Sequence, residues 1–220
     1  MFDRSFFALL ASLTALGLAG CAASMERRVA GMVAADPRPA AFTVCHGSGC
    51  KVRTPVDLNA AQWAKLRALF EPAPADAASE RVRIADAIGL VERLVAKQAG
   101  TGQDAARNLV ASDQSTQLDC IDEAVNSTTY LRMIAADGLL RFHAVRPPAH
   151  RGGILLAHNT AVVREIATGQ DFAVDSWFFA NGEPPAILPL TTWRAGWEPG
   201  DTIAATSAAT QASEGAPPQP

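Results

Sequence analysis

Apolar residues recur at helical spacing in two segments of the first half of the chain. Residues 59–72 begin with a capping-box pattern, Asn59 followed three positions later by Gln62, and they end at Pro72. A longer segment, residues 79–100, stops at Gly100 and carries an apolar stripe formed by Ile84, Ile88, Val91 and Val95. The spacing predicts two amphipathic helices whose apolar sides face a common core.

The second half of the chain changes from helical to alternating periodicity. A third helix is predicted from about Cys120 to Gly138, where a glycine suits a left-handed C-terminal cap. Segments 139–145, 153–166 and 171–179 then alternate apolar and polar residues between turn-forming stretches, which predicts strands. Residues 181–197 are a turn followed by an irregular apolar segment. Helices followed by an antiparallel sheet indicate the α+β class.

Composition and charge narrow the class of partner. The 220 residues have the apolar and charged content of an ordinary globular protein, so the chain can bury a core. Its formal net charge is −3 and its Lys and Arg residues are scattered along the sequence. Nucleic-acid binding requires a basic surface, so no nucleic-acid partner is expected. Nothing in the sequence indicates an oligomeric state.

The first residues have the pattern of an export leader. Arg4 precedes an apolar stretch, residues 6–20, that is too short to span a membrane comfortably, since a span needs roughly 20 residues. The stretch ends in Leu-Ala-Gly-Cys, which resembles the bacterial lipobox. The resemblance implies cleavage before Cys21, lipidation of its thiol and attachment to a membrane. Because Ala22 follows the cysteine and no aspartate does, sorting to the outer membrane is expected. An ordinary secretory peptide or a membrane anchor is the alternative.

These features divide the chain into four parts. Residues 1–20 are the predicted signal peptide, and residues 21–40 are the predicted tether. Residues 41–198 form the predicted domain. The low-complexity tail, residues 199–220, is predicted to be disordered.

Two cysteines, Cys45 and Cys50, flank a Gly-rich tetrapeptide between short β-branched stretches. In an oxidising compartment this pattern predicts a disulfide across a hairpin-like loop. Haem attachment is excluded because it requires Cys-x-x-Cys-His, whereas His46 directly follows the first cysteine. A redox or zinc site that includes His46 is a weaker alternative. No other metal site and no cofactor are expected.

Cys120 is then the remaining cysteine, and it lies next to Asp119 where a helix begins. Unpaired backbone N–H groups and the helix dipole stabilise a thiolate at such a position, and they can also stabilise an oxyanion. We therefore expect the pKa of Cys120 to lie below the ordinary thiol value of about 8.5. A catalytic cysteine also needs a base and a group that orients the base. His158 at a strand start and Asp175 in the next strand supply both residue types in order.

The segment "DCIDEAVNSTTYLRMIAADGL" resembles the cysteine helix of the bacterial transglutaminase-like cysteine proteinases, within the wider papain-like and transglutaminase-like group. "HNTAVV" followed by "FAVDSW" resembles the hairpin of the same family that carries histidine and aspartate. The resemblance covers residues 113–180. It implies that Cys120 is the nucleophile, that His158 is the general base and acid, and that Asp175 orients His158. It also implies a papain-like fold in which the cysteine helix packs on an antiparallel sheet.

The sequence departs from this family pattern at one position, and the triad sets a condition on the length of one hairpin loop. Ile121 occupies the position after the cysteine, where the family often has an acidic residue that helps to bind calcium. A tight two-residue turn at Thr168-Gly169 would also pair Asp175 with Val162, on the order of 13 Å along the strand from His158. A triad therefore requires a longer hairpin loop or a bulge around residues 166–171.

The expected function is that of a membrane-tethered periplasmic thiol hydrolase or acyltransferase. It would act on a peptide or another amide bond in the cell envelope. The alternative is a non-catalytic envelope lipoprotein that uses the same fold as a scaffold or binding module. Taken singly, each residue of the triad also has an ordinary structural role open to it, because cysteine is among the most buried residue types. His143 and His150 lie beside turn-forming residues and are expected at the surface.

Overall fold

A computed structural model describes residues 22–107, 115–152 and 157–201. The predicted signal peptide, the lipidation site Cys21 and residues 202–220 of the predicted tail lie outside the described residues. Within the described residues, no helix is both long and apolar enough to cross a membrane.

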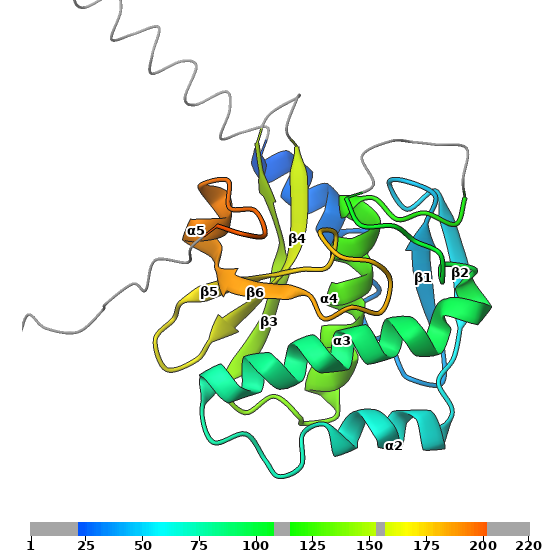
Figure 1. The fold of residues 1–220 in the computed structure, drawn as a ribbon, viewed down its shortest axis with the longest axis horizontal. Coiled ribbons are helices and arrows are strands. Elements are labelled where there is room, and N and C mark those ends of the chain that lie inside the picture. The colour runs from blue at the N-terminus through cyan, green and yellow to red at the C-terminus, as the bar shows by residue number, and fades with distance from the viewer. Residues whose placement is uncertain (1–21, 108–114, 153–156, 202–220) are drawn as a thin grey trace, which may run out of the picture.

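The architecture is α+β, as predicted (Figure 1). A two-stranded hairpin pairs β1 (Phe42–His46) with β2 (Val52–Val56). A four-stranded antiparallel sheet follows the chain order β3-β4-β5-β6. Its strands are β3 (His143–Arg151), β4 (His158–Glu165), β5 (Asp171–Asp175) and β6 (Ala186–Pro189).

The helices are capped as their sequences predict. α2 (Ala60–Ala68) begins with a capping box between Asn59 and Gln62. α3 (Ala77–Ala99) begins two residues earlier than the apolar stripe indicated, because Asp76 caps it, and it ends at the left-handed Gly100. α4 (Cys120–Ala136) begins at the cysteine. A short helix, α5 (Leu190–Arg194), and β6 occupy the segment that the sequence indicated only as irregular and apolar.

α4 lies at the centre of the molecule, between the four-stranded sheet and the β1–β2 hairpin (Figure 1). α3 and α2 pack beside it and close the main core. One face of the sheet joins this core through residues such as Ala161 and Val174, whereas the opposite face packs against α5 in a second cluster around Trp193. The end of the sheet where β4 begins therefore lies near the start of α4.

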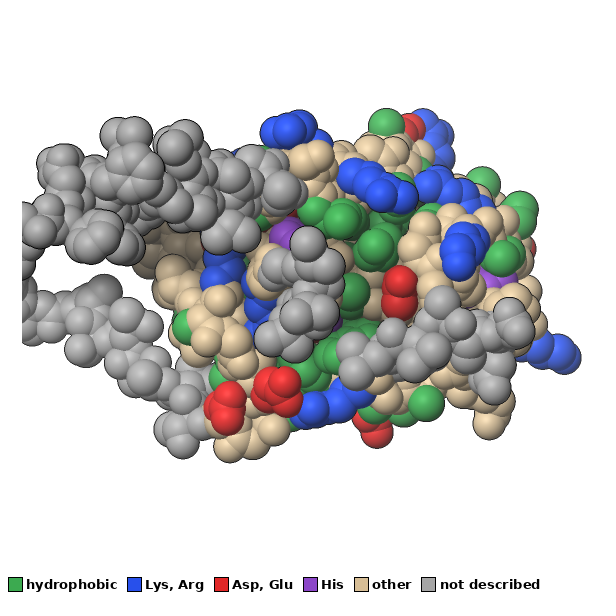
Figure 2. Space-filling view, turned by 90° about the horizontal axis from the view of Figure 1, so that it is seen from above, with side chains coloured by type: hydrophobic (Ala, Val, Ile, Leu, Met, Phe, Trp, Pro, Cys, Tyr) green, Lys and Arg blue, Asp and Glu red, His purple; other side chains and the backbone are tan. Residues whose placement is uncertain are grey.

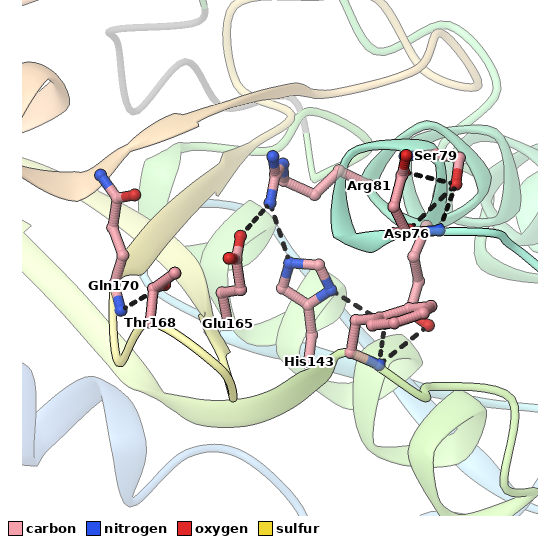
Figure 3. A network of polar contacts seen from close by, with 9 residues as sticks. Asp76, Ser79, Arg81, His143, Glu165, Thr168 and Gln170 are labelled. Carbon is pink, nitrogen blue, oxygen red and sulfur yellow. Dashed lines mark hydrogen bonds and ion pairs between the residues drawn. The ribbon is translucent and has the colours of Figure 1, made fainter. Parts of the chain in front are cut away.

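A buried polar network ties α3 to the beginning of β3. Glu80 accepts hydrogen bonds from the backbone N–H groups of Arg141 and Phe142, and its Oε1 lies 2.8 Å from Nδ1 of His143. Figure 3 shows Arg81 directed toward His143 and Glu165, and the Arg81–Glu165 ion pair spans 2.8 Å. Burial raises the pKa of Glu80, but these hydrogen bonds outweigh it and lower the pKa overall.

β3 differs from the sequence prediction, which placed a loop at residues 146–153. The strand continues to Arg151 because a register shift between Arg146 and Ala149 accommodates Pro147 and Pro148. Proline lacks the N–H that a central strand requires, but an edge strand with a bulge tolerates it. As a result His150 is buried within the strand, and His143 is buried at its start, so neither is a surface residue.

The segment predicted as a tether packs on the domain. Residues 22–30 are helical, and Val29 and Val33 are buried against the Cys45–Cys50 loop and Val125 of α4. Arg38 and Ala41 form an isolated β-bridge just before β1. Met25, Val29, Met32 and Val33 recur at helical spacing, and they are buried or half-buried through contacts with the Cys45–Cys50 loop and α4.

Candidate functional site

The start of α4 is held by side chains and by the Cys45–Cys50 loop. Asp119 is the N-cap, and its Oδ1 accepts hydrogen bonds from the backbone N–H groups of Ile121 and Asp122. Gly49 donates to Oδ2 of Asp119 at 2.9 Å. Ser48 and Cys50 donate to the carboxylate of Asp122 at 2.9 and 2.6 Å. These bonds fix the first turn of the helix on which Cys120 lies.

The left-handed backbone of the loop makes this arrangement possible. Residues 47–50 all have positive φ angles, between 58° and 76°, so successive N–H groups turn toward the two carboxylates. Cys45 and Cys50 lie at disulfide-bonding distance, with their Cα atoms 4.7 Å apart. Both ring nitrogens of His46 have hydrogen-bond partners, the carbonyl of Ser115 and the hydroxyl of Thr54. The zinc alternative therefore has no geometric support at this loop.

His158 and Asp175 come together at the end of the sheet. Nε2 of His158 lies 2.7 Å from Oδ2 of Asp175, and both side chains are buried. The hairpin between β4 and β5 pairs Val162 with Ala173 instead of Asp175, because its loop comprises four residues, 166–169. Continuing this register puts Asp175 opposite Thr160, two residues from His158 and on the same face of the sheet. The longer loop required by the sequence analysis is present.

Aromatic side chains surround this pair. Nε1 of Trp193 donates to Oδ2 of Asp175 at 2.6 Å, so the carboxylate oxygen has two partners. The ring centroids of Trp177, Phe178 and Trp193 lie 4.6, 5.3 and 5.5 Å from that of His158. Among the described residues, Nδ1 of His158 makes no hydrogen bond. The imidazole is thus oriented by its Nε2 contact and by packing.

The thiol of Cys120 is half-buried, and its polar neighbour is Asn159. Nδ2 of Asn159 donates to Sγ at 3.6 Å, and the Asn159 backbone N–H also bonds with the thiol. Oδ1 of Asn159 lies 3.1 Å from Nδ1 of His150. Within the described part of the chain, Sγ makes no hydrogen bond with His158. The structure thus brings His158 and Asp175 into contact and sets Cys120 beside the residue that follows His158.

The acidity of Cys120 differs from the sequence expectation. Burial, aided by the negative charges of Asp119 and Asp175, raises the pKa of the thiol to about 11. The two hydrogen bonds from Asn159 lower it but do not offset the burial. The expectation of a lowered pKa relied on unpaired N–H groups at the helix start. Asp119 instead accepts hydrogen bonds from two of these groups, those of Ile121 and Asp122.

Behind the cysteine, α4 faces further buried carboxylates. Glu123 and Glu92 are both buried, and Oε2 of Glu123 and Oε1 of Glu92 make no hydrogen bond among the described residues. Burial raises the pKa of Glu92 to about 7, and burial together with the charge of Glu92 raises the pKa of Glu123 well above its ordinary value. Burial also raises the pKa of Asp104 to about 6. Despite this density of acids, no group of three or more His, Cys, Asp or Glu side chains in the described ranges could hold a metal ion.

In the described part of the chain, the side chain of Gln117, three residues before the cysteine, bonds with the loop before it and not with the sulfur. Gln117 donates to the carbonyl of Gln103 at 2.9 Å and accepts from the backbone of Ala105. Gln114 lies outside the described residues. The backbone N–H of Cys120 makes no hydrogen bond among the described residues.

Figure 2 looks onto this end of the molecule and shows hydrophobic side chains in the middle of the face with Lys and Arg side chains around them. A hollow of about 190 Å³ lies elsewhere, between the sheet and α5. Its lining includes Arg146, Asp171 and Arg194 but neither Cys120 nor His158. The chemical residues and this hollow are therefore separate features.

Asn159, His150 and Trp193 are contacts that sequence reasoning missed as parts of the site. Asn159 directly follows the predicted base, so the sequence places it near the site. The sequence does not show that its side chain points toward Cys120. His150 and Trp193 reach the site only through the β3 bulge and through α5, which the sequence did not predict.

Comparison with protein-family models, with curated proteins and with solved structures finds no match to this chain.

Proposed function

We propose that the chain is a thiol-dependent acyl-transfer enzyme of the bacterial cell envelope, with a papain-like, transglutaminase-like arrangement of its α+β fold. The observation that carries the proposal is the buried His158–Asp175 contact of 2.7 Å at the end of the sheet where α4 begins with Cys120. Asn159, the next residue after His158, contacts Sγ. His158 and Asp175 lie on the α5 face of the sheet and Cys120 lies on the α4 face, so the base, its orienting carboxylate and the nucleophile share one end of the fold.

The proposed reaction follows from the roles of these groups. Nδ1 of His158 takes the proton of the thiol as Sγ attacks the carbonyl carbon of an amide. The C–N bond then breaks, His158 returns the proton to the leaving amine, and a thioester remains on Cys120. Water, deprotonated by His158, releases a carboxylic acid and restores the thiol, or a second amine accepts the acyl group. The raised pKa of Cys120 means that the proton leaves during the attack and not before it.

One contact must form during this reaction. Sγ and His158 share no hydrogen bond among the described residues. Hydrogen bonds between catalytic groups are often long in the ligand-free state and tighten when the substrate binds. His158 packs among aromatic side chains on the α5 face, so in the proposed reaction its imidazole turns past the start of β4 to bring Nδ1 to Sγ.

The proposed substrate is a peptide or another amide of the cell envelope. The leader and the lipobox-like cysteine at position 21 supply the argument for this location, because they imply export and attachment to a membrane.

The test is acylation by an activated ester such as p-nitrophenyl acetate. Wild-type protein is expected to release about one equivalent of p-nitrophenolate in a burst and to carry one acyl group on Cys120, because a thioester forms faster than it hydrolyses. Mass spectrometry of the Cys120 peptide identifies the modified residue. Cys120→Ser and His158→Ala should each lose at least about a hundredfold in the acylation rate.

His143→Gln is the matched control, because His143 is a buried histidine paired with a carboxylate at the α3 side of the sheet. It should keep the acylation rate wherever it remains folded by circular dichroism. Equal acylation of wild type and His158→Ala, or no modification of Cys120, would overturn the proposal.

The non-catalytic scaffold is the second candidate, and one observation favours it. The thiol bonds with Asn159 and has a pKa raised to about 11, so it is protonated in the resting protein. A fold retained for binding has no need of an acidic thiol. The same acylation experiment separates the two candidates, since a scaffold does not depend on His158.

A further inference from the structure

Asn159 presents two hydrogen-bond donors to the sulfur of Cys120. Its side-chain amide donates to Sγ at 3.6 Å, and its backbone N–H is directed to the same atom. Asn159 is only 3 % exposed, so water does not compete freely for these donors. Among the contacts of the thiol, those from Asn159 are the ones that favour the charged form.

The orientation of the amide is itself fixed. His150 lies opposite Asn159 in the β3–β4 register, and its Nδ1 is 3.1 Å from Oδ1 of Asn159. An N–H on Nδ1 of His150 donates to this oxygen, which leaves Nδ2 of Asn159 to face the sulfur. The backbone N–H of His150 donates to Glu26 of the helical segment 22–30 at 3.1 Å, so the position of His150 is anchored from the other side.

We propose that Asn159 stabilises the negative charge that develops on Sγ of Cys120, and that His150 is the positioning residue that aims the Asn159 amide at the sulfur. The proposal rests on the proposed function and adds a second polar residue to its site. The role is needed because the charged groups near the sulfur oppose ionisation. Asp119 at the helix start and Asp175 at the end of β5 carry negative charges that oppose formation of a thiolate. His158, the titratable group at the start of β4, makes no hydrogen bond with Sγ among the described residues.

The expected size of this stabilisation is that of one hydrogen bond, the one that the Asn159 amide donates to Sγ. A hydrogen bond to a charged group contributes more than one between neutral groups, and its loss corresponds to about a tenfold change in the fraction of thiolate. The remaining backbone N–H of Asn159 keeps the effect from being larger.

The experiment measures the rate at which iodoacetamide alkylates Cys120 near neutral pH in the full chain without reductant. The product is quantified on the Cys120 peptide by mass spectrometry. Asn159→Leu removes the donor and keeps a side chain of similar size, so water does not enter in place of the amide. It should slow alkylation about tenfold and shift the pH profile upward by about one unit. His150→Phe keeps Asn159 but frees its amide to rotate, and should slow alkylation about threefold.

Thr129→Val is the matched control, because it removes a buried hydroxyl from the same helix while contacting neither Cys120 nor Asn159. Its alkylation rate should equal that of wild type. If Asn159→Leu does not fold, Asn159→Ser takes its place and should give a smaller decrease in the same direction.

An alkylation rate that is unchanged or faster in the folded Asn159 variant would overturn the proposal. The outcome is separate from that of the acyl-transfer proposal, because iodoacetamide reports the thiol without a substrate. Acylation that requires His158 together with alkylation that ignores Asn159 would refute only the role of Asn159. The reverse pattern would confirm that role and refute acyl transfer.

Discussion

At the start of β4, His158 and Asn159 point to opposite faces of the sheet, as successive residues of a strand do. His158 meets the aromatic cluster and Asp175, whereas Asn159 meets Cys120 and His150. The chemistry of the site is therefore divided between two adjacent residues with different partners. The sequence alone does not show which of these two adjacent residues contacts the sulfur.

Glu92 and Glu123 carry the clearest pH dependence at the residue scale. Burial raises the pKa of Glu92 from 4.5 to about 7 and that of Glu123 well above its ordinary value, so the folded protein holds protons that the unfolded chain releases. Their contribution is fully present below about pH 4.5 and is lost as the pH rises through 7. Asp104 and Asp122, with pKa values raised to about 6 and about 7, act in the same direction.

We predict that the free energy of unfolding falls by a few kcal/mol between about pH 5 and pH 8, since each proton involved contributes about 1.4 kcal/mol per pH unit. Urea unfolding at a series of pH values measures it. Glu92→Gln should flatten the decrease, because an amide does not ionise. Stability that rises over this interval in the wild type would contradict the raised pKa values.

At the scale of elements, the Cys45–Cys50 loop and α4 form one unit. The loop gives three backbone N–H groups to Asp119 and Asp122, and Asn126 of α4 exchanges two hydrogen bonds with the backbone of Cys45, at 2.7 and 2.8 Å. The hairpin that the sequence identified for its cysteines thus positions the helix that the sequence identified for Cys120.

We predict that replacing both cysteines of this loop, Cys45→Ser with Cys50→Ser, lowers the free energy of unfolding by about 2 kcal/mol, the chain-entropy value for a loop this short. Urea unfolding without reductant provides the measurement. Wild-type protein treated with reductant should show the same decrease. If the serine variant unfolds at the same urea concentration as the oxidised wild type, the loop does not stabilise the start of α4.

Element positions were predictable to different degrees for physical reasons. α2 and the start of α4 follow from local signals, the Asn59 cap and the Asp119-Cys120 pair, and both were predicted. β3 was cut short because two prolines normally exclude a strand, whereas an edge position with a bulge accepts them. β6 has four residues and no alternation of its own, so only pairing with β5 reveals it.

At the scale of the whole molecule, the packing sets the electrostatics of the site. The sequence indicated Cys120, His158 and Asp175 from their order and spacing, and the length of the β4–β5 loop brings the last two together. The direction predicted for the pKa of Cys120 was wrong, because burial of the thiol raises this pKa most, and that burial depends on how the sheet packs against the start of α4. Burial of this kind is a property of the assembled fold.

The most direct test of acyl transfer by Cys120 is the pH dependence of its acylation rate by p-nitrophenyl acetate, in wild type and in His158→Ala. With His158 as the base, the wild-type rate near neutral pH should be at least about a hundredfold above that of the variant, because the imidazole takes the thiol proton during the attack. A wild-type rate that keeps rising toward the thiol pKa of about 11 and matches that of His158→Ala would contradict the account.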